Sequence, residues 1–241
     1  MTCIVGLIDE MTGNVIIGGD SAGVGGLDLT ARKDSKVFQN GEFIMGFTTS
    51  FRMGQVLRFG LKPTPIPEDV DLYEYMVVTF TNDVRKAFKD AGVAHRHNEV
   101  ETGGSFLVGV RGRLFHVQSD FQVGENIAPF AACGCGDAYA LGAMEVLQAV
   151  DMDPVGKVEK ALATAVAWSA GVRPPFNVIV LPPKIGPARQ EPSVQDGDPG
   201  VVPQDGDPGG HPRDEPTGGA KIYDSPAVAT RSCAGIVTRP N

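Results

Sequence analysis

Strand-like and helix-like patterns come in runs along this chain rather than in strict alternation. Short segments rich in branched residues read as strands, and longer segments with helical spacing read as helices. Runs of this kind favour an α+β fold with antiparallel sheets. Two sheets stacked between two helical layers, a four-layer αββα sandwich, is the expected arrangement. The expected strands cover 3–9, 15–20, 36–38, 42–49, a pair within 104–120, and 176–183, and the expected helices cover 50–60, 72–92, 136–150 and 154–170.

Two of these segments carry further predictions. A turn containing Gly13 and Asn14 joins the first two strands into a hairpin, with the start of the first strand at the end of a core sheet. The helix over 72–92 is expected to end at Gly92. Its apolar residues have helical spacing and are expected to face the core: Tyr73, Met76, Val77, Phe80, Val84 and Phe88.

The composition changes sharply after Pro183. The segment 184–241 is rich in Pro, Gly and Asp, and the hexapeptide QDGDPG occurs in it at 195–200 and again at 204–209. Such a segment buries too little apolar surface to offset its ordering entropy. We therefore expect one folded domain over 1–183 and a disordered tail over 184–241. The repeated Asp-Gly-Asp lacks the ligand ladder and distal Glu of an EF-hand loop.

Charge and composition exclude several classes of protein. The net charge of −8 argues against a nucleic-acid partner, because phosphate contacts need clustered Lys and Arg. No apolar run approaches the roughly 20 residues that span a bilayer, and no signal peptide is expected. Four cysteines without a framework spacing indicate a reducing compartment, the cytoplasm. No cofactor or metal is expected, since the glycine-rich segments lack a P-loop Lys and Cys133 and Cys135 have no second pair.

The threonine behind Met1 is the first candidate for chemistry. If Met1 is removed, Thr2 carries both a hydroxyl and a free α-amine, a group whose ordinary pKa of about 7.7–8.0 suits a base at neutral pH. The pair needs a cation to lower the hydroxyl pKa and a carboxylate to hold that cation. Lys36, just before a strand, is the candidate cation, and Asp20, at the end of the hairpin, is the candidate carboxylate. Each residue alone has an ordinary structural interpretation, and only the combination indicates a catalytic site.

These residues lie in motifs that resemble the proteasome β-type subunits and the bacterial HslV peptidase, which are N-terminal nucleophile hydrolases. The matching text is TCIVG, VIIGGDSAG around Asp20, DSKVF around Lys36, FIMGFTTS, and ACGCGDAYALGAMEVL later in the chain. Asp20 and Lys36 both lie further from Thr2 than in that family, by the same two-residue offset, which one longer first hairpin explains. The segment VRPPFNV is similar to the Anbu branch. The resemblance covers about 2–183.

The resemblance implies roles for further residues. Thr2 would be the nucleophile, with Lys36 stabilising the alkoxide and Asp20 orienting Lys36. A backbone N–H at Thr49, where the family usually has Gly, would bind the oxyanion. Cys135 stands where the family has a serine. The family's supporting Asp on the last helix aligns with Ala167, and Ser169 is the nearest polar neighbour.

The function that the resemblance implies is a threonine-type endopeptidase subunit of a self-compartmentalising protease. Its expected substrate is unfolded polypeptide, its expected assembly is a homo-oligomeric ring, and a separate ATPase unfoldase would supply any ATP-driven unfolding. Two alternatives stay open. One is a small-molecule amidase of the same superfamily, and the other is a non-catalytic ring subunit, which the departures at Ala167 and Cys135 motivate.

Overall fold

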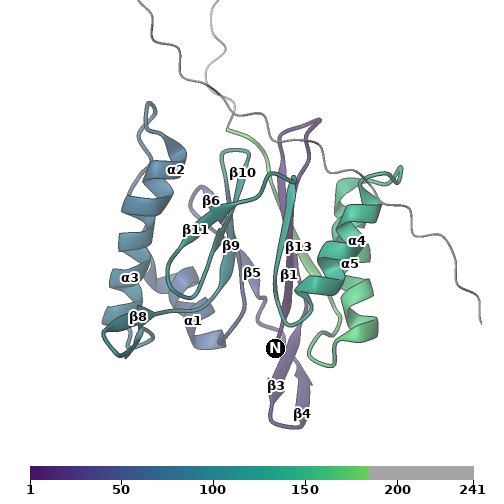
Figure 1. Ribbon diagram of the computed structural model, residues 1–241, viewed down its shortest axis with the longest axis horizontal. Coiled ribbons are helices and arrows are strands. Elements are labelled where there is room, and N and C mark those ends of the chain that lie inside the picture. Colours follow the sequence, from purple (N-terminus) through teal and green to yellow (C-terminus); the bar gives the residue numbers. More distant parts are fainter. Residues whose placement is uncertain (185–241) are drawn as a thin grey trace, which may run out of the picture. The chain divides into compact units, whose positions relative to one another are not determined.

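The structure is a computed structural model that describes residues 1–184, with only the backbone of His97. The segment 185–241, nearly all of the expected tail, lies outside the described residues, so its disorder stays a prediction. The described part contains two larger antiparallel sheets, two small hairpins and two groups of helices (Figure 1). These antiparallel sheets and helices together confirm the α+β class.

The first sheet has four strands in the order β12-β1-β2-β13. They are β12 (Phe130–Gly134), β1 (Cys3–Ile8), β2 (Val15–Gly19) and β13 (Asn177–Leu181). The predicted hairpin of β1 and β2 is confirmed, and Gly13 in its turn has a φ of 72°, which glycine adopts without strain. Because β1 is an inner strand, its first residue lies at the sheet end between two neighbours.

The second sheet has five strands in the order β11-β10-β9-β6-β5. They are β11 (Val123–Glu125), β10 (Arg113–Val117), β9 (Phe106–Val110), β6 (Phe43–Phe47) and β5 (Val37–Asn40). Apolar side chains of both sheets meet in one buried cluster, which includes Ile4, Ile17, Val37, Ile44 and Leu107. The two sheets therefore pack face to face, and this packing brings the start of β5 close to the ends of β1 and β2.

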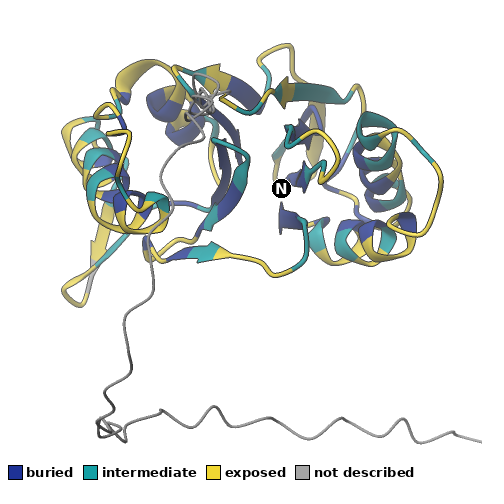
Figure 2. Ribbon diagram, turned by 90° about the horizontal axis from the view of Figure 1, so that it is seen from above, coloured by how far each residue is buried: buried dark blue, intermediate teal, exposed yellow. Residues whose placement is uncertain are grey.

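Helices cover the outer face of each sheet (Figures 1 and 2). On the first sheet, α4 (Asp137–Leu147) and α5 (Pro154–Trp168) bury side chains such as Met144 and Leu162 against β1 and β12. Asp153 caps the N-terminus of α5 by accepting a hydrogen bond from the Gly156 N–H at 2.8 Å. On the second sheet lie α1 (Phe51–Gln55), η1 (Val56–Gly60), α2 (Leu72–Tyr75), η2 (Met76–Phe80) and α3 (Thr81–Asp90).

The predicted helix over 72–92 needs one correction. Met76, Phe80, Val84 and Phe88 are buried as expected, but Tyr73 and Val77 are 44% and 41% exposed. Val77 lies in η2, whose wider π-helical turn shifts the faces of the helix relative to regular 3.6-residue spacing. Tyr73 lies before η2, in α2, and its hydroxyl donates to the carbonyl oxygen of Val123 at 3.2 Å. Gly92 follows the end of α3 with a φ of 65°, as expected for a helix stop.

No strand was predicted for β11, for β12, or for two further hairpins. The glycine-rich stretch after Asp20 contains β3 (Ala22–Gly25) and β4 (Asp28–Ala31). The polar segment after α3 contains β7 (His95–His97) and β8 (Val100–Thr102). Neither segment has the apolar alternation by which a strand is found from sequence, because both hairpins expose most of their residues.

Candidate active site

The N-terminus of the chain lies at the end of the first sheet (Figure 1), and Thr2 immediately precedes β1. Its side chain is buried, although Met1 before it is exposed. The Thr2 amide N–H donates to Cys135 Sγ at 3.3 Å, and the Thr2 hydroxyl donates to the carbonyl oxygen of Met1. With Met1 in place, the Thr2 nitrogen is an amide and cannot accept a proton. Removal of Met1 would free an amine at a position next to the Cys135 thiol.

The register of the β1–β2 hairpin places Asp20 beside Thr2. Ile4 pairs with Gly19, so Asp20 lies next to Cys3, whose carbonyl accepts the Asp20 N–H at 3.3 Å. The Asp20 side chain is fully buried and accepts four hydrogen bonds. Oδ1 accepts from the Cys3 N–H at 3.0 Å and from Lys36 Nζ at 2.8 Å. Oδ2 accepts from the N–H groups of Ala22 at 2.9 Å and Arg173 at 3.1 Å.

Lys36 is the cation of this buried pair, with 1% of its side chain exposed. Burial lowers the pKa of Lys36 from its ordinary value, and the hydrogen bond to Asp20 opposes that shift. Lys36 Nζ also lies 5.7 Å from the ring centroid of Phe51. A buried ion pair needs further hydrogen bonds to offset its desolvation, and the three main-chain donors on Asp20 supply them.

Cys135 and Ser169 lie on the other side of Thr2. Cys135 Sγ and Ser169 Oγ are 3.4 Å apart, and Ser169 directly follows α5. The sequence comparison with the family placed Ala167 at the supporting position. In the structure Ala167 is exposed on α5, and Ser169, one half-turn further, is the residue that reaches the site. The departure at Ala167 therefore lies outside the hydrogen-bonded cluster around Thr2.

Thr49 lies between β6 and α1, at the corner that the sequence indicated. Its φ is 66°, a left-handed conformation that is strained for a β-branched residue and relaxed for glycine. Thr49 Oγ1 compensates for part of this strain by accepting the Ser105 N–H at 3.3 Å and by contacting Thr48 Oγ1 at 3.2 Å. The conformation matches a position at which the related family usually has Gly.

The structure thus brings together five of the six residues chosen from the sequence: Thr2, Asp20, Lys36, Cys135 and Ser169. Thr49 hydrogen-bonds to Ser105 instead of to this group. Sequence reasoning missed Arg173, which donates its backbone N–H to Asp20. No side-chain pattern could have indicated it, because any residue except proline carries that donor.

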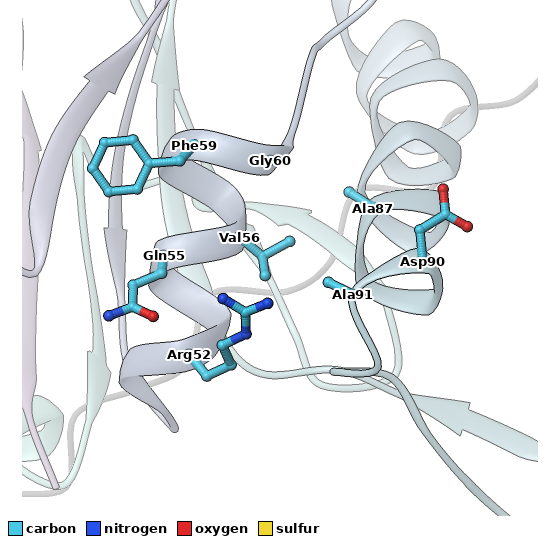
Figure 3. Close-up of a pocket in the computed structure, with 8 residues that line it drawn as sticks. All are labelled: Arg52, Gln55, Val56, Phe59, Gly60, Ala87, Asp90 and Ala91. Atoms are coloured by element: carbon cyan, nitrogen blue, oxygen red, sulfur yellow. The ribbon is translucent and has the colours of Figure 1, made fainter.

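One cavity of the structure lies elsewhere. Between α1, η1 and α3 is a hollow of about 530 Å³, lined by Arg52, Gln55, Val56, Phe59, Gly60, Ala87, Asp90 and Ala91 (Figure 3). Its wall contains none of the residues around Thr2. In residues 1–184 no group of three or more His, Cys, Asp and Glu side chains is placed to hold a metal ion, and no helix there is long and apolar enough to cross a membrane.

Solved structures share this arrangement of elements. BPH from Thiobacillus denitrificans in complex with epoxomicin matches with a TM-score of 0.62 and 20% identity, over 75% of this chain and 98% of that chain. The fold is that of BPH, HslV and Anbu. The eukaryotic HslV from Trypanosoma brucei matches with a TM-score of 0.54 and 19% identity, over 75% of this chain and 99% of that one.

Anbu (ancestral beta-subunit) from Yersinia bercovieri matches with a TM-score of 0.52 and 16% identity, over 76% of this chain and 82% of that one. No family model and no curated protein matches the sequence. The solved structures confirm the resemblance to HslV and Anbu that the sequence motifs indicated. At these identities the likeness shows the fold.

Proposed function

We propose that this chain is a threonine-type peptidase subunit with the four-layer αββα architecture, and that Thr2 becomes the nucleophile when Met1 is removed. The observation that carries the proposal is the fully buried Lys36–Asp20 pair, which is hydrogen-bonded to the residue next to Thr2. A buried ion pair is costly to retain for stability alone, and charged pairs of this kind gather at catalytic sites. Here the pair adjoins a buried threonine at the end of a core strand.

In the proposed reaction, the freed amine of Thr2 accepts the proton of its own hydroxyl, through a water. Thr2 Oγ1 then attacks the carbonyl carbon of a peptide bond and forms a tetrahedral intermediate. As the C–N bond breaks, the leaving amine takes the proton from the Thr2 ammonium, and an ester to Oγ1 remains. Water then hydrolyses the ester, releasing the carboxylic acid and restoring the hydroxyl.

The surrounding groups have distinct tasks in this scheme. The Lys36 ammonium stabilises the developing alkoxide on Thr2, and Asp20 holds Lys36 in place. The backbone N–H of Thr49 donates to the oxyanion. Cys135 and Ser169 orient the freed amine, since Cys135 Sγ already lies 3.3 Å from the Thr2 nitrogen and 3.4 Å from Ser169 Oγ.

The proposed substrate is unfolded polypeptide, which reaches Thr2 inside a ring of identical subunits. Apolar side chains that stay exposed on α4 and α5 support self-assembly, notably Val146 at 68% and Trp168 at 71% exposure. The similar BPH structure holds epoxomicin, a peptide that carries an epoxyketone, which supports a peptide-binding site in this fold. A separate ATPase unfoldase and a cytoplasmic location are parts of the same proposal.

The intact mass of the purified protein before and after incubation with epoxomicin tests the proposal. An epoxyketone forms a stable ring only with a terminal residue that offers both a hydroxyl and a free amine. We expect Met1 to be absent, the adduct to form on the wild type, and Thr2→Ala to form none. Retention of Met1, or unchanged cleavage of an unfolded protein by Thr2→Ala, would contradict the mechanism. Turnover of small amides alone would favour the amidase alternative.

A further inference from the structure

Arg173 connects the segment after α5 to Asp20, the carboxylate beside Thr2. Its backbone N–H donates to Asp20 Oδ2 at 3.1 Å, and its carbonyl accepts the Ser21 N–H at 2.9 Å. These two bonds attach the segment after α5 to the end of β2, across a separation of 153 positions. The main chain at Arg173 therefore helps to hold the carboxylate that holds Lys36.

The side chain of Arg173 turns back to the end of α5. Its Nη1 donates to the carbonyl oxygen of Ser169 at 3.1 Å and to that of Val172 at 2.6 Å. Ser169 is the C-cap of α5, where the last carbonyls lack partners in the helix and carry partial negative charge, so a cation beside the Ser169 carbonyl is favourable. The Val172 carbonyl belongs to the turn that follows. A guanidinium suits this place because it stays charged and donates in fixed directions.

The turn that Arg173 holds, Ser169–Val172, lies directly against the site. Ser169 Oγ is 3.4 Å from Cys135 Sγ. A Cβ atom added at Gly171 would lie 2.9 Å from Cys135 Sγ, and it would be closer still to the Met1 side chain. Within the turn itself, the hydrogen bond from the Val172 N–H to the Ser169 carbonyl is long, at 3.3 Å. The two guanidinium bonds restrain this turn together with the bond from the Ser169 N–H to the Ala165 carbonyl at 2.9 Å.

We propose that the Arg173 guanidinium is an internal cation that positions the Ser169–Val172 turn against Thr2. Arg173 is a positioning residue, because its side chain acts through Ser169 and Cys135 and touches none of the reacting atoms. The inference rests on the proposed function, since it names a residue on which the geometry of the Thr2 site depends. Loss of the side chain leaves the backbone N–H to Asp20 intact and frees only the turn.

Chemical rescue tests this role. We expect Arg173→Ala to form the epoxomicin adduct roughly tenfold to a hundredfold more slowly than the wild type, because small misplacements are costly in a catalytic site. Ethylguanidinium at about 50 mM, far below the molar concentrations that unfold proteins, should restore most of the rate by filling the vacated place. NaCl at equal ionic strength and urea should not restore it. Arg173→Lys should lie between the two, since its ammonium is a single point charge.

The control variant is Arg96→Ala, which removes an exposed guanidinium paired with Glu99 on the β7–β8 hairpin. It should react at the wild-type rate and show no response to ethylguanidinium. A second readout is independent of catalysis. The rate at which iodoacetamide alkylates Cys135 should rise in Arg173→Ala, because the turn no longer rests against the thiol, and it should fall again when ethylguanidinium is added.

The two readouts separate failure of this inference from failure of the proposed function. A wild type that forms no adduct would contradict Thr2 as the nucleophile, and the alkylation rates would still decide the role of Arg173. If Arg173→Ala forms the adduct and is alkylated at Cys135 at the same rates as the wild type, the inference is overturned. The inference is also overturned if Arg173→Ala has the wild-type melting temperature, forms the adduct slowly, and regains none of the adduct rate with any guanidinium compound. Should Arg173→Ala fail to fold, a wild-type alkylation rate in folded Arg173→Lys would overturn the inference, and an intermediate rate would support it.

Discussion

Lys36 Nζ lies 2.8 Å from Asp20 Oδ1, and the two side chains are 1% and 0% exposed. The partners are unequal, because Asp20 also accepts three main-chain N–H groups, whereas Asp20 is the single salt-bridge partner of Lys36 in the described residues. The carboxylate is thus the centre of the arrangement around Thr2, and the lysine is one of its four donors.

Replacement of Asp20 should destabilise the protein more than replacement of Lys36. In Asp20→Asn an NH₂ group replaces one carboxylate oxygen and then faces N–H donors, from which it cannot accept a hydrogen bond. We expect a loss of about 3–5 kcal/mol in the free energy of unfolding. Lys36→Met leaves the carboxylate with its three main-chain donors, and we expect about 1–3 kcal/mol. Urea denaturation measures both values.

The matched controls are Asp28→Asn and Lys33→Met, both at exposed positions near the same strands. Each should change the free energy of unfolding by less than about 0.5 kcal/mol. A larger loss of stability in Lys36→Met than in Asp20→Asn would contradict this prediction. It would show that the ion pair, and not the three main-chain N–H donors, holds the carboxylate.

Thr49→Gly should keep the reaction with epoxomicin. The proposed oxyanion donor is the backbone N–H, which glycine retains, and a φ of 66° is unstrained for glycine. We expect the adduct rate to stay within about threefold of the wild type, less than about 0.7 kcal/mol in the barrier. The bond from Ser105 to Thr49 Oγ1 is lost, so stability is expected to change little in total. A loss of activity beyond a hundredfold would instead assign the role to the Thr49 hydroxyl.

Alkylation should distinguish the three cysteines around β1 and β12. Cys135 is exposed, whereas Cys3 and Cys133 are buried and burial raises the pKa of both thiols. In the folded protein, iodoacetamide should therefore modify Cys135 and leave the other two intact, as peptide mass mapping would show. The added group next to the Thr2 nitrogen should block the epoxomicin adduct. Cys135→Ser should be resistant to this block, and an alkylated wild type that still reacts normally would place Cys135 outside the site.

Stability should fall in mildly acidic solution because of His116. Burial lowers the pKa of His116 below its ordinary value near 6.5, and its Nε2 lies 2.7 Å from Ser105 Oγ. Below pH 6.5 the unfolded chain binds a proton at His116 more readily than the folded chain does. The contribution of His116 to stability is therefore complete above pH 6.5 and is lost as the pH falls toward the pKa of His116 in the folded protein. His116→Gln, which cannot titrate, should show a flatter urea-midpoint profile between about pH 5 and 6.5. Identical profiles would remove His116 as the cause.

Local patterns alone were sufficient for most elements and for the central pair of the site. The hairpin of β1 and β2 follows from two branched, apolar segments around a turn with Gly13, and the short connection sets its register. That register places Asp20 beside Cys3, so the nearness of Thr2 and Asp20 is already contained in the sequence. The π-helical η2 shows the limit of such patterns, because regular helical spacing predicts a buried Val77 and the wider turn leaves Val77 exposed.

Tertiary structure decided what surrounds that pair. Cys135 and Thr2 are separated by 133 positions, and Arg173 and Asp20 by 153, and both contacts exist because sheet pairing and the packing of α5 bring distant segments together. The end of α5 brings Ser169, which the sequence indicated as the polar neighbour of Ala167, to the site and leaves Ala167 exposed. Hydrophobic periodicity determines which face of an element is buried, but backbone donors and helix ends meet only in the folded chain. The sequence therefore determined the residues of the candidate chemistry, and the tertiary structure determined which groups hold them in position.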